Sequence, residues 1–337
     1  MILPGRRIPL PLIILLVFPL LWLLWLGMYV ISPGPTAAAE RIEVFIPPST
    51  SLAGIEKILA AEGVIHDDPR FTMLALLTGA ASRLRAGEYA FFPEKKPLEI
   101  IRQLKEGKVL YRPVTIPEGT ELAGVAAILA AGDWVDKHRF LELGRDPELL
   151  AEAGITAESF EGYLFPDTYR LSKSQLDEAG IIRMMVKRQQ EVFAEIVGGV
   201  AAIPRGLTPH EVITLASIVE KETGIPAERP LVASVFLNRL AKNMRLQADP
   251  TVRYGLQNKT EQLTRRQLTR SSPYNTYLVS GLPPGPIANP GRASIEAVLS
   301  PAETDYLYFV AKDGQSHHFS RSLKEHNRAV AKFRKTQ

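Results

Sequence analysis

The sequence predicts an α+β protein with three parts: a single N-terminal transmembrane helix, a small strand–helix–helix–strand module, and a larger mixed α+β domain. Three observations support this prediction. An uncharged apolar run extends from Ile8 to Ile31. A strand-like segment that ends in Ile-Pro and leads into an amphipathic helix occurs twice. Finally, helical and extended patterns follow one another without the regular alternation of a parallel α/β sheet.

The composition excludes several classes of protein. The chain has 337 residues, no cysteine and a net charge of +4. The lack of cysteine rules out a disulfide framework, a cysteine nucleophile and thiolate metal sites. A mild basic excess suits an anionic membrane surface or an acidic polymer. No basic stripe with interleaved aromatic residues appears, so we expect no nucleic-acid partner, and no motif calls for a cofactor.

The N-terminal apolar run is long enough to span a bilayer, since 24 residues extend about 36 Å as a helix. Arg6 and Arg7 precede it, and the positive-inside rule places them in the cytoplasm. We therefore expect a cytoplasmic tail at residues 1–9, a transmembrane helix at 10–32, and a periplasmic chain beyond. The alternative is a signal peptide cleaved near Ala37–Ala39, but the run is longer than the usual apolar part of a signal peptide.

A tether at residues 33–42 precedes an internal repeat. VFIPPSTSLAGIEKILAA at Val44–Ala61 recurs as VTIPEGTELAGVAAILAA at Val114–Ala131, an offset of 70 residues. Each copy predicts a short strand that ends in Ile-Pro, then a turn, then an amphipathic helix.

Residues 43–112 form the predicted small module. After the first copy of the repeat, a helix is expected from Asp68-Pro69 to Leu77, a strand over Leu84–Phe92 and a helix over Pro97–Gly107. The strand–helix–helix–strand order resembles the LysM module, which in known proteins binds glycans that contain N-acetylglucosamine. A small α+β spacer remains the alternative.

Residues 113–337 form the predicted larger domain. Its amphipathic segments predict helices over Leu176–Val197, Pro230–Lys242 and Leu323–Arg334 and a strand over Tyr306–Ala311. Their apolar residues are expected to form the core. The turn-rich segment Gly281–Gly291 is expected to be a rigid loop.

The helix predicted between Thr208 and Gly224 carries two acids near its end. Thr208 and Glu211 form a capping box at its start, and Gly224 is expected to stop it. A carboxyl group held against an apolar surface has a raised pKa, which a general acid for glycosidic cleavage needs near neutral pH. Glu220 and Glu222 are the two candidates.

Periodicity does not choose between these acids. On a helical wheel they fall at opposite margins of the apolar face, with Thr214 and Ser217 on the polar side. The alternative that both acids are ordinary surface residues of the helix therefore remains open.

Seven blocks of the sequence resemble the YceG-like endolytic murein transglycosylase family, in the order that the family has them, and together with the N-terminal run they cover essentially the whole chain. The blocks are EGYLFPDTY (161–169), LASIVEKET (215–223), FLNRL (236–240), MRLQADPTVRYG (244–255), SPYNTY (272–277), GLPPGPIANPG (281–291) and YLYFVA (306–311).

This resemblance implies an enzyme in the inner membrane with its catalytic domain, residues 113–337, in the periplasm. Such enzymes cut the bond between N-acetylmuramic acid and N-acetylglucosamine within nascent glycan strands. They use no water and leave 1,6-anhydromuramoyl ends that terminate strand elongation. The implied partners are glycan strands, the membrane and peptidoglycan synthases of the penicillin-binding class.

The resemblance assigns the catalytic acid to the first glutamate of IVEKET, which is Glu220, acting first as acid and then as base. Glu222 becomes a supporting acid. Residues expected to contact the substrate are Asn275, Gln247, Glu161, Tyr163 and Tyr274. A turn asparagine, a turn-capping glutamine, an exposed loop acid and buried aromatic residues are the corresponding structural alternatives.

Two other enzyme classes are excluded by spacing. A penicillin-binding transpeptidase needs Ser-x-x-Lys, whereas Ser217 and Lys221 are four residues apart. A zinc hydrolase of the HExxH type lacks its motif among the six histidines. A membrane-tethered glycan-binding scaffold and a muramidase that uses water remain open as alternatives.

Overall fold

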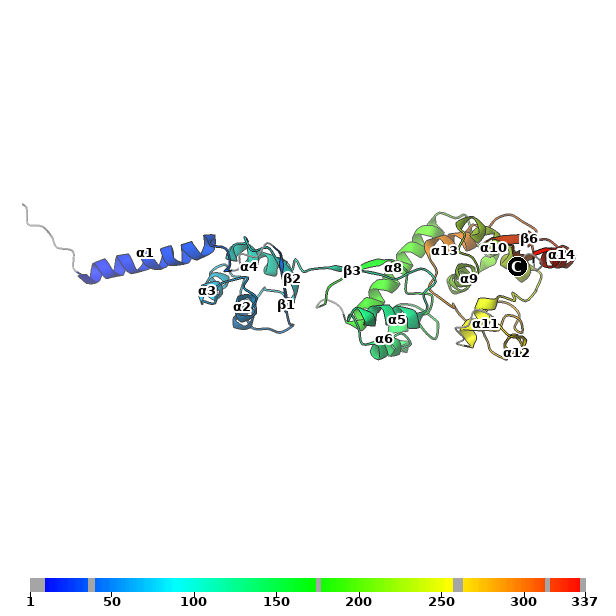
Figure 1. Ribbon diagram of the computed structural model, residues 1–337, viewed down its shortest axis with the longest axis horizontal. Coiled ribbons are helices and arrows are strands. Elements are labelled where there is room, and N and C mark those ends of the chain that lie inside the picture. Colours follow the sequence, from blue (N-terminus) through cyan, green and yellow to red (C-terminus); the bar gives the residue numbers. More distant parts are fainter. Residues whose placement is uncertain (1–9, 36–39, 174–176, 257–262, 313–315, 334–337) are drawn as a thin grey trace, which may run out of the picture. The chain divides into compact units, whose positions relative to one another are not determined.

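The computed structural model describes residues 10–35, 40–173, 177–256, 263–312 and 316–333. The chain divides into two compact units, one of residues 1–112 with 170–176 and the other of residues 113–169 with 177–337. Figure 1 shows the order of the helices and strands along the chain.

The first helix, α1, runs over Leu10–Ile31 and contains Pro19. Its described side chains are Leu15 and those from Val17 onward. Across the part of the chain that the structure describes, no helix is both long and apolar enough to cross a membrane. At the C-terminal end of α1, Tyr29 is buried in the core of the first unit, and the Arg70 guanidinium lies 4.7 Å from its ring centroid.

The predicted strand–helix–helix–strand order is present in the first unit. Its elements are β1 (Ile42–Ile46), α2 (Leu52–Ala61), α3 (Arg70–Leu77), β2 (Gly87–Phe91) and α4 (Pro97–Glu106). The two strands pair antiparallel, from Ile42 opposite Phe91 to Ile46 opposite Gly87. Their alternate side chains pack with the helices into one apolar core. Helix α4 ends where Gly107 takes a left-handed conformation, as predicted.

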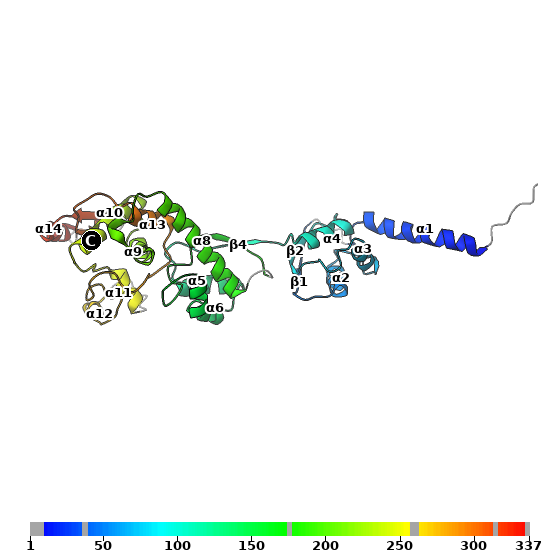
Figure 2. The same ribbon diagram turned by 180° about the vertical axis from the view of Figure 1, so that it is seen from behind.

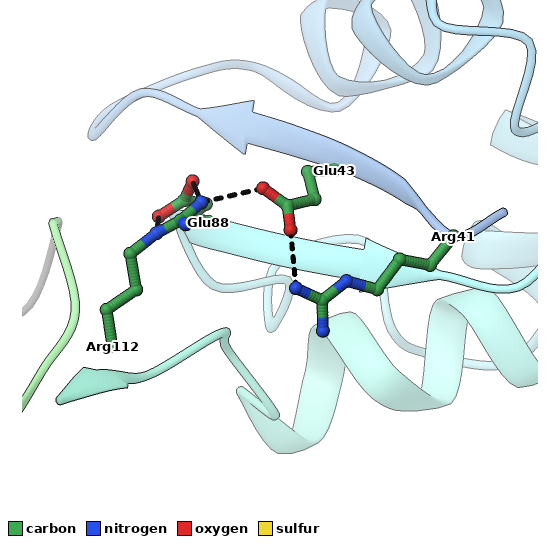
Figure 3. A network of polar contacts seen from close by, with 4 residues as sticks. All are labelled: Arg41, Glu43, Glu88 and Arg112. Atoms are coloured by element: carbon green, nitrogen blue, oxygen red, sulfur yellow. Dashed lines mark hydrogen bonds and ion pairs between the residues drawn. The ribbon is translucent and has the colours of Figure 1, made fainter.

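A network of charged side chains joins the end of this unit to its sheet (Figure 3). The Arg112 guanidinium donates to Glu43 at 2.6 Å and to Glu88 at 2.8 Å, and Arg41 donates to Glu43 at 2.8 Å. The hydrogen bond from Arg112 lowers the pKa of Glu43. Because the network lies at the surface, its main effect is to fix the position of Arg112 and not to add much stability.

The internal repeat has the same local structure in both copies. In the first, the Thr50 hydroxyl donates to the Pro47 carbonyl at 2.7 Å; in the second, Thr120 donates to Pro117 at 2.6 Å. Each turn leads into a ten-residue helix, α2 in the first copy and α5 (Leu122–Ala131) in the second. The turn therefore specifies the start of the helix in both places.

The second unit is mostly helical. Its helices after α5 are α6 (Lys137–Leu143), α7 (Pro147–Glu152), α8 (Glu178–Gly198), α9 (Pro209–Glu222), α10 (Arg229–Ala241), α11 (Asp249–Gly255), α12 (Arg265–Leu268), α13 (Arg292–Leu299) and α14 (Leu323–Phe333). Two 3₁₀ turns lie at Pro204–Gly206 and Pro226–Glu228. The other strands of the chain are β3 (Arg112–Thr115), which pairs with β4 (Thr168–Leu171), and β5 (Tyr308–Ala311), which pairs with β6 (His317–Ser320).

Helix α9 is the centre of the second unit and packs against α10 and α13 (Figures 1 and 2). All residues from Val212 to Val219 are buried. The expectation that Thr214 and Ser217 form a polar outer side is wrong. Their hydroxyls donate to the carbonyls of His210 and Thr214, so the helix satisfies them internally and can be covered on every side.

The predicted elements are present with shifted ends. The strand expected over Leu84–Phe92 is limited to Gly87–Phe91 by its five-residue pairing with β1. The long helix α8 begins at Glu178, because the Asp177 side chain accepts from the Gly180 amide and caps it. The predicted end of the last helix, Arg334, and residues 1–9 of the expected cytoplasmic tail lie outside the described residues.

Candidate active site

The C-terminal end of α9 presents the two acids that the sequence singled out. The capping box at its start is as predicted: the Glu211 carboxylate accepts from the Thr208 amide at 2.8 Å, and the Thr208 hydroxyl accepts from the Glu211 amide at 3.3 Å. The helix ends at Glu222, earlier than the predicted stop at Gly224, because Thr223 is already extended with φ −142°.

Glu220 is held by two donors. Its Oε1 accepts from Arg229 Nη2 at 3.2 Å and its Oε2 accepts from the Gly291 amide at 2.9 Å. The side chains of Glu220 and Arg229 are only 6% and 10% exposed. Both carboxylate oxygens therefore accept hydrogen bonds from donors within the protein.

A second acid, Glu118, shares this cluster. Its Oε2 lies 3.8 Å from Arg229 Nη2. Burial, with a smaller contribution from Glu220, raises the pKa of Glu118. Arg229 thus lies between two carboxyl groups, and Glu118, which the sequence analysis did not consider, comes from the second copy of the Ile-Pro turn.

Glu222 lies in a different environment two residues further on. No hydrogen bond from a described residue reaches its carboxyl group. Burial, together with the nearby carboxylate of Asp249 and against the opposing effect of Arg253 and Arg239, raises the pKa of Glu222 to about 8. The shift favours the protonated form of this carboxyl group.

Asp249 is the first residue of α11 and is fixed by Tyr277, whose hydroxyl donates to Asp249 Oδ1 at 2.7 Å. Asn275 positions Tyr277 in turn, because its Oδ1 accepts from the Tyr277 amide at 3.0 Å. Sequence reasoning missed both Asp249 and Tyr277, although they lie within the ADPT and SPYNTY blocks.

Asn275 itself is fully buried. Its side-chain nitrogen donates to the carbonyls of Leu268 and Arg270 at 3.0 and 2.8 Å. Since both amide hydrogens are used inside the loop, the expected contact of Asn275 with substrate gives way to a structural role: it holds the loop that carries Tyr277.

Gln247 lies close in sequence to Asp249 and has an exposed side chain. Its backbone is left-handed, with φ 49°, which is unusual for a residue other than glycine. The conformation is held by a hydrogen bond from its amide to the Thr276 carbonyl at 3.1 Å. A non-glycine residue kept in this conformation, with a free amide side chain, is consistent with the expected contact with substrate.

Glu161 is not at the surface of a cleft. Its carboxyl group is buried and accepts from the Leu122 amide at 3.0 and 3.1 Å, so it caps helix α5. Burial raises the pKa of Glu161 to about 8. The expected substrate contact is therefore replaced by a structural function.

The two candidate tyrosines are both largely covered. Tyr163 is buried, and its hydroxyl lies 2.7 Å from His210 Nδ1 at the opposite end of α9 from Glu222. The half-buried ring of Tyr274 contacts the ring of Tyr254, with centroids 4.9 Å apart. The structure thus brings Asp249 and Tyr277 to Glu222, and leaves Tyr163 elsewhere in the unit.

Comparison with known proteins gives consistent results. The YceG-like family matches residues 44–332. An endolytic murein transglycosylase of Bacillus subtilis (strain 168) is 34% identical over 322 residues, which are 91% of this chain and 89% of that protein. An endolytic murein transglycosylase of Streptococcus pneumoniae serotype 2 is 27% identical over 327 residues, which are 87% of this chain and 58% of that protein.

A solved structure agrees. The crystal structure of a YceG-like protein from Listeria monocytogenes matches with a TM-score of 0.58 at 35% sequence identity, over 86% of this chain and 99% of that one.

Proposed function

Because the chain belongs to the YceG-like family and is a peptidoglycan lytic transglycosylase, we propose that it cuts the N-acetylmuramic acid–N-acetylglucosamine bond within nascent glycan strands. The products are 1,6-anhydromuramoyl ends, which cannot be extended. The observation that carries the proposal is the half-buried Glu222 carboxyl group at the end of α9, which receives no hydrogen bond from a described residue and whose pKa is raised, as a general acid requires.

In the proposed reaction, neutral Glu222 donates its proton to the glycosidic oxygen as the bond to C1 breaks. The carbonyl oxygen of the substrate's own N-acetyl group relieves the positive charge that develops at C1. The Glu222 carboxylate then takes the proton of the C6 hydroxyl as its oxygen bonds to C1. Glu222 gives up one proton in the first step and regains one in the second, so neither water nor a second catalytic carboxylate is required.

The environment of the two acids favours Glu222 over Glu220, the acid that the family resemblance had indicated. Both oxygens of Glu220 are already engaged, by Arg229 at 3.2 Å and by the Gly291 amide at 2.9 Å, whereas no described residue donates a hydrogen bond to the Glu222 carboxyl group. We therefore assign Glu220 to holding Arg229 and the start of α13 against the end of α9.

Asp249, Tyr277 and Gln247 complete the proposed site. A negative Asp249 helps to retain the proton on Glu222, and Tyr277 keeps Asp249 in place. The exposed side chain of Gln247 offers both a donor and an acceptor to a sugar.

The location and the first unit are further parts of the proposal. The uncharged run at residues 8–31, preceded by Arg6 and Arg7, supports an anchor in the inner membrane with the second unit in the periplasm. There the protein would meet the peptidoglycan synthases. The order of β1, α2, α3 and β2 supports a LysM-like role in glycan binding. Recovery of a soluble periplasmic form that begins near Glu40 would contradict the anchor.

The test of function is product analysis. Full-length protein is incubated with uncrosslinked glycan strands, and the ends are identified by mass spectrometry. Internal cleavage to anhydro ends is the expected result. Reducing ends, heavier by one water, would identify a muramidase instead, and binding without cleavage would identify a scaffold.

A further inference from the structure

A cavity at the start of α9, separate from the site around Glu222, is not explained by the proposed reaction. It holds about 530 Å³ and is lined by the loop after α7, by α8 and by the first turn of α9. This volume is in the range of small-molecule sites. The apolar part of its lining includes Phe193, Ile213 and Ile155.

The side chain of Gln189 is the most informative group in this cavity. It is only 4% exposed, and its amide makes no hydrogen bond to any residue that the structure describes. Neither atom of this amide is fully covered, so the amide is open to the cavity that Gln189 lines. Because Gln189 lines the cavity, a ligand there would supply the missing donor and acceptor.

A second polar group faces the same space. His210 Nε2 lies 2.9 Å from the Pro284 carbonyl, which can only accept, so Nε2 carries the hydrogen. With the hydrogen on Nε2, Nδ1 is the acceptor for the Tyr163 hydroxyl at 2.7 Å. The Tyr163 oxygen keeps its lone pairs for a further donor.

Among the described residues that line it there is no aspartate, glutamate, lysine or arginine. Its uncharged polar groups are the Gln189 and Gln190 amides, the Thr156 and Thr208 hydroxyls, the Tyr163 oxygen and the His210 ring, and they lie beside an apolar wall. A secondary amide that bears a methyl group matches the Gln189 amide, the Tyr163 oxygen and the apolar wall: its carbonyl accepts from Gln189, its N–H donates to Gln189 or Tyr163, and its methyl group packs on Phe193 and Ile213.

We propose that this cavity is an accessory subsite for a methyl-bearing secondary amide of peptidoglycan. The inference rests on the proposed function, since the polymer supplies this group as the N-acetyl group of its sugars or as the alanyl amide of its stem peptides. His210 and Glu222 are 12 residues apart on α9, which corresponds to about 18 Å. The subsite would hold a strand remote from the bond that is cut, as cleavage within strands requires.

The experiment measures binding in the Glu222→Gln background, in which cleavage is slowed by on the order of 10²–10⁴. Two probes, triacetylchitotriose and a sugar-free stem tetrapeptide, are titrated by NMR. Gln189→Leu should weaken binding of one probe about tenfold. The control is Gln190→Leu, since that amide already donates to the Ala153 carbonyl at 2.9 Å and should matter less than twofold.

The readouts separate a binding role from a structural one. Gln189→Leu removes no hydrogen bond within the protein, so its melting temperature should be unchanged or higher. If this variant does not fold, Ala153→Leu, which fills the cavity from its rim, carries the same expectation. Loss of chitotriose binding identifies the N-acetyl source, and loss of peptide binding identifies the alanyl source.

The inference is overturned if neither probe binds below about 10 mM, or if the folded cavity variants bind both probes like the parent. In the catalytically active chain, Gln189→Leu should raise KM for long strands and leave kcat unchanged. Binding in the cavity without any anhydro product would refute the proposed function and leave the subsite standing.

Discussion

Exchanging each acid of α9 for its amide separates the two roles assigned to them. Glu222→Gln keeps the shape of the side chain and removes the transferable proton. The rate of formation of anhydro ends should fall by on the order of 10²–10⁴. Stability at neutral pH should change little, because the carboxyl group it replaces is already neutral there.

Glu220→Gln should have the opposite profile. It removes the charge that is 3.2 Å from a nearly buried Arg229, whose Nε already has no hydrogen-bond partner among the described residues. Breaking a buried ion pair costs about 3–5 kcal/mol. Since Glu118 at 3.8 Å still faces Arg229, we expect about 2–3 kcal/mol, or a melting temperature lower by roughly 4–12 °C. The folded fraction should keep activity within about tenfold.

The assay combines product mass spectrometry with a thermal melt of each variant, and rates are normalised to folded protein. Glu211→Gln serves as the control, because its amide oxygen can still accept from Thr208 and complete the capping box. A stable, inactive Glu220→Gln beside an active Glu222→Gln would refute the assignment and restore Glu220 as the acid.

Three further predictions follow from the same contacts. The cleavage rate should decrease as the pH rises through about 8, where Glu222 loses its proton, and a rate that still rises there would contradict this. Tyr277→Phe removes the 2.7 Å hydrogen bond to Asp249 and should lower kcat about tenfold with an unchanged melt; an unaltered pH profile would argue against this route to Glu222. The pKa of Glu161 is raised on folding, so its contribution to stability falls as the pH rises from about 4.3 to about 8. Glu161→Gln should make the free energy of unfolding depend less on pH and should raise it at pH 8 by on the order of 1–3 kcal/mol. Denaturant titration at several pH values measures this change.

Features that a few neighbouring residues determine could be predicted from the sequence. The capping box of Thr208 and Glu211, the left-handed Gly107 and the repeated Thr-Pro turns all depend on contacts within about four residues. The same is true of the order of elements in the first unit. These contacts do not depend on distant parts of the chain, so the local sequence pattern is enough to predict them.

Features that depend on distant segments were missed. The pattern of α9 predicted an outer polar side, but α10 and α13 cover the helix and its hydroxyls turn to its own carbonyls. Glu161 looked like a loop acid, yet its partner is the Leu122 amide, 39 residues earlier. The pattern of apolar and polar residues within a segment does not indicate which distant residue will contact it.

The choice between the two acids illustrates the same limit at the site itself. A helical wheel places Glu220 and Glu222 at equivalent margins of one helix, because it contains only the helix. What separates them comes from elsewhere: the Gly291 amide lies 71 residues beyond Glu220, whereas Glu222 meets Asp249 from the start of α11. Glu220 accepts hydrogen bonds from Arg229 and Gly291, whereas burial and the like charge of Asp249 raise the pKa of Glu222. Two glutamates that are two residues apart on one helix can therefore have different roles, one structural and one catalytic. The segment that contacts each glutamate determines its chemistry.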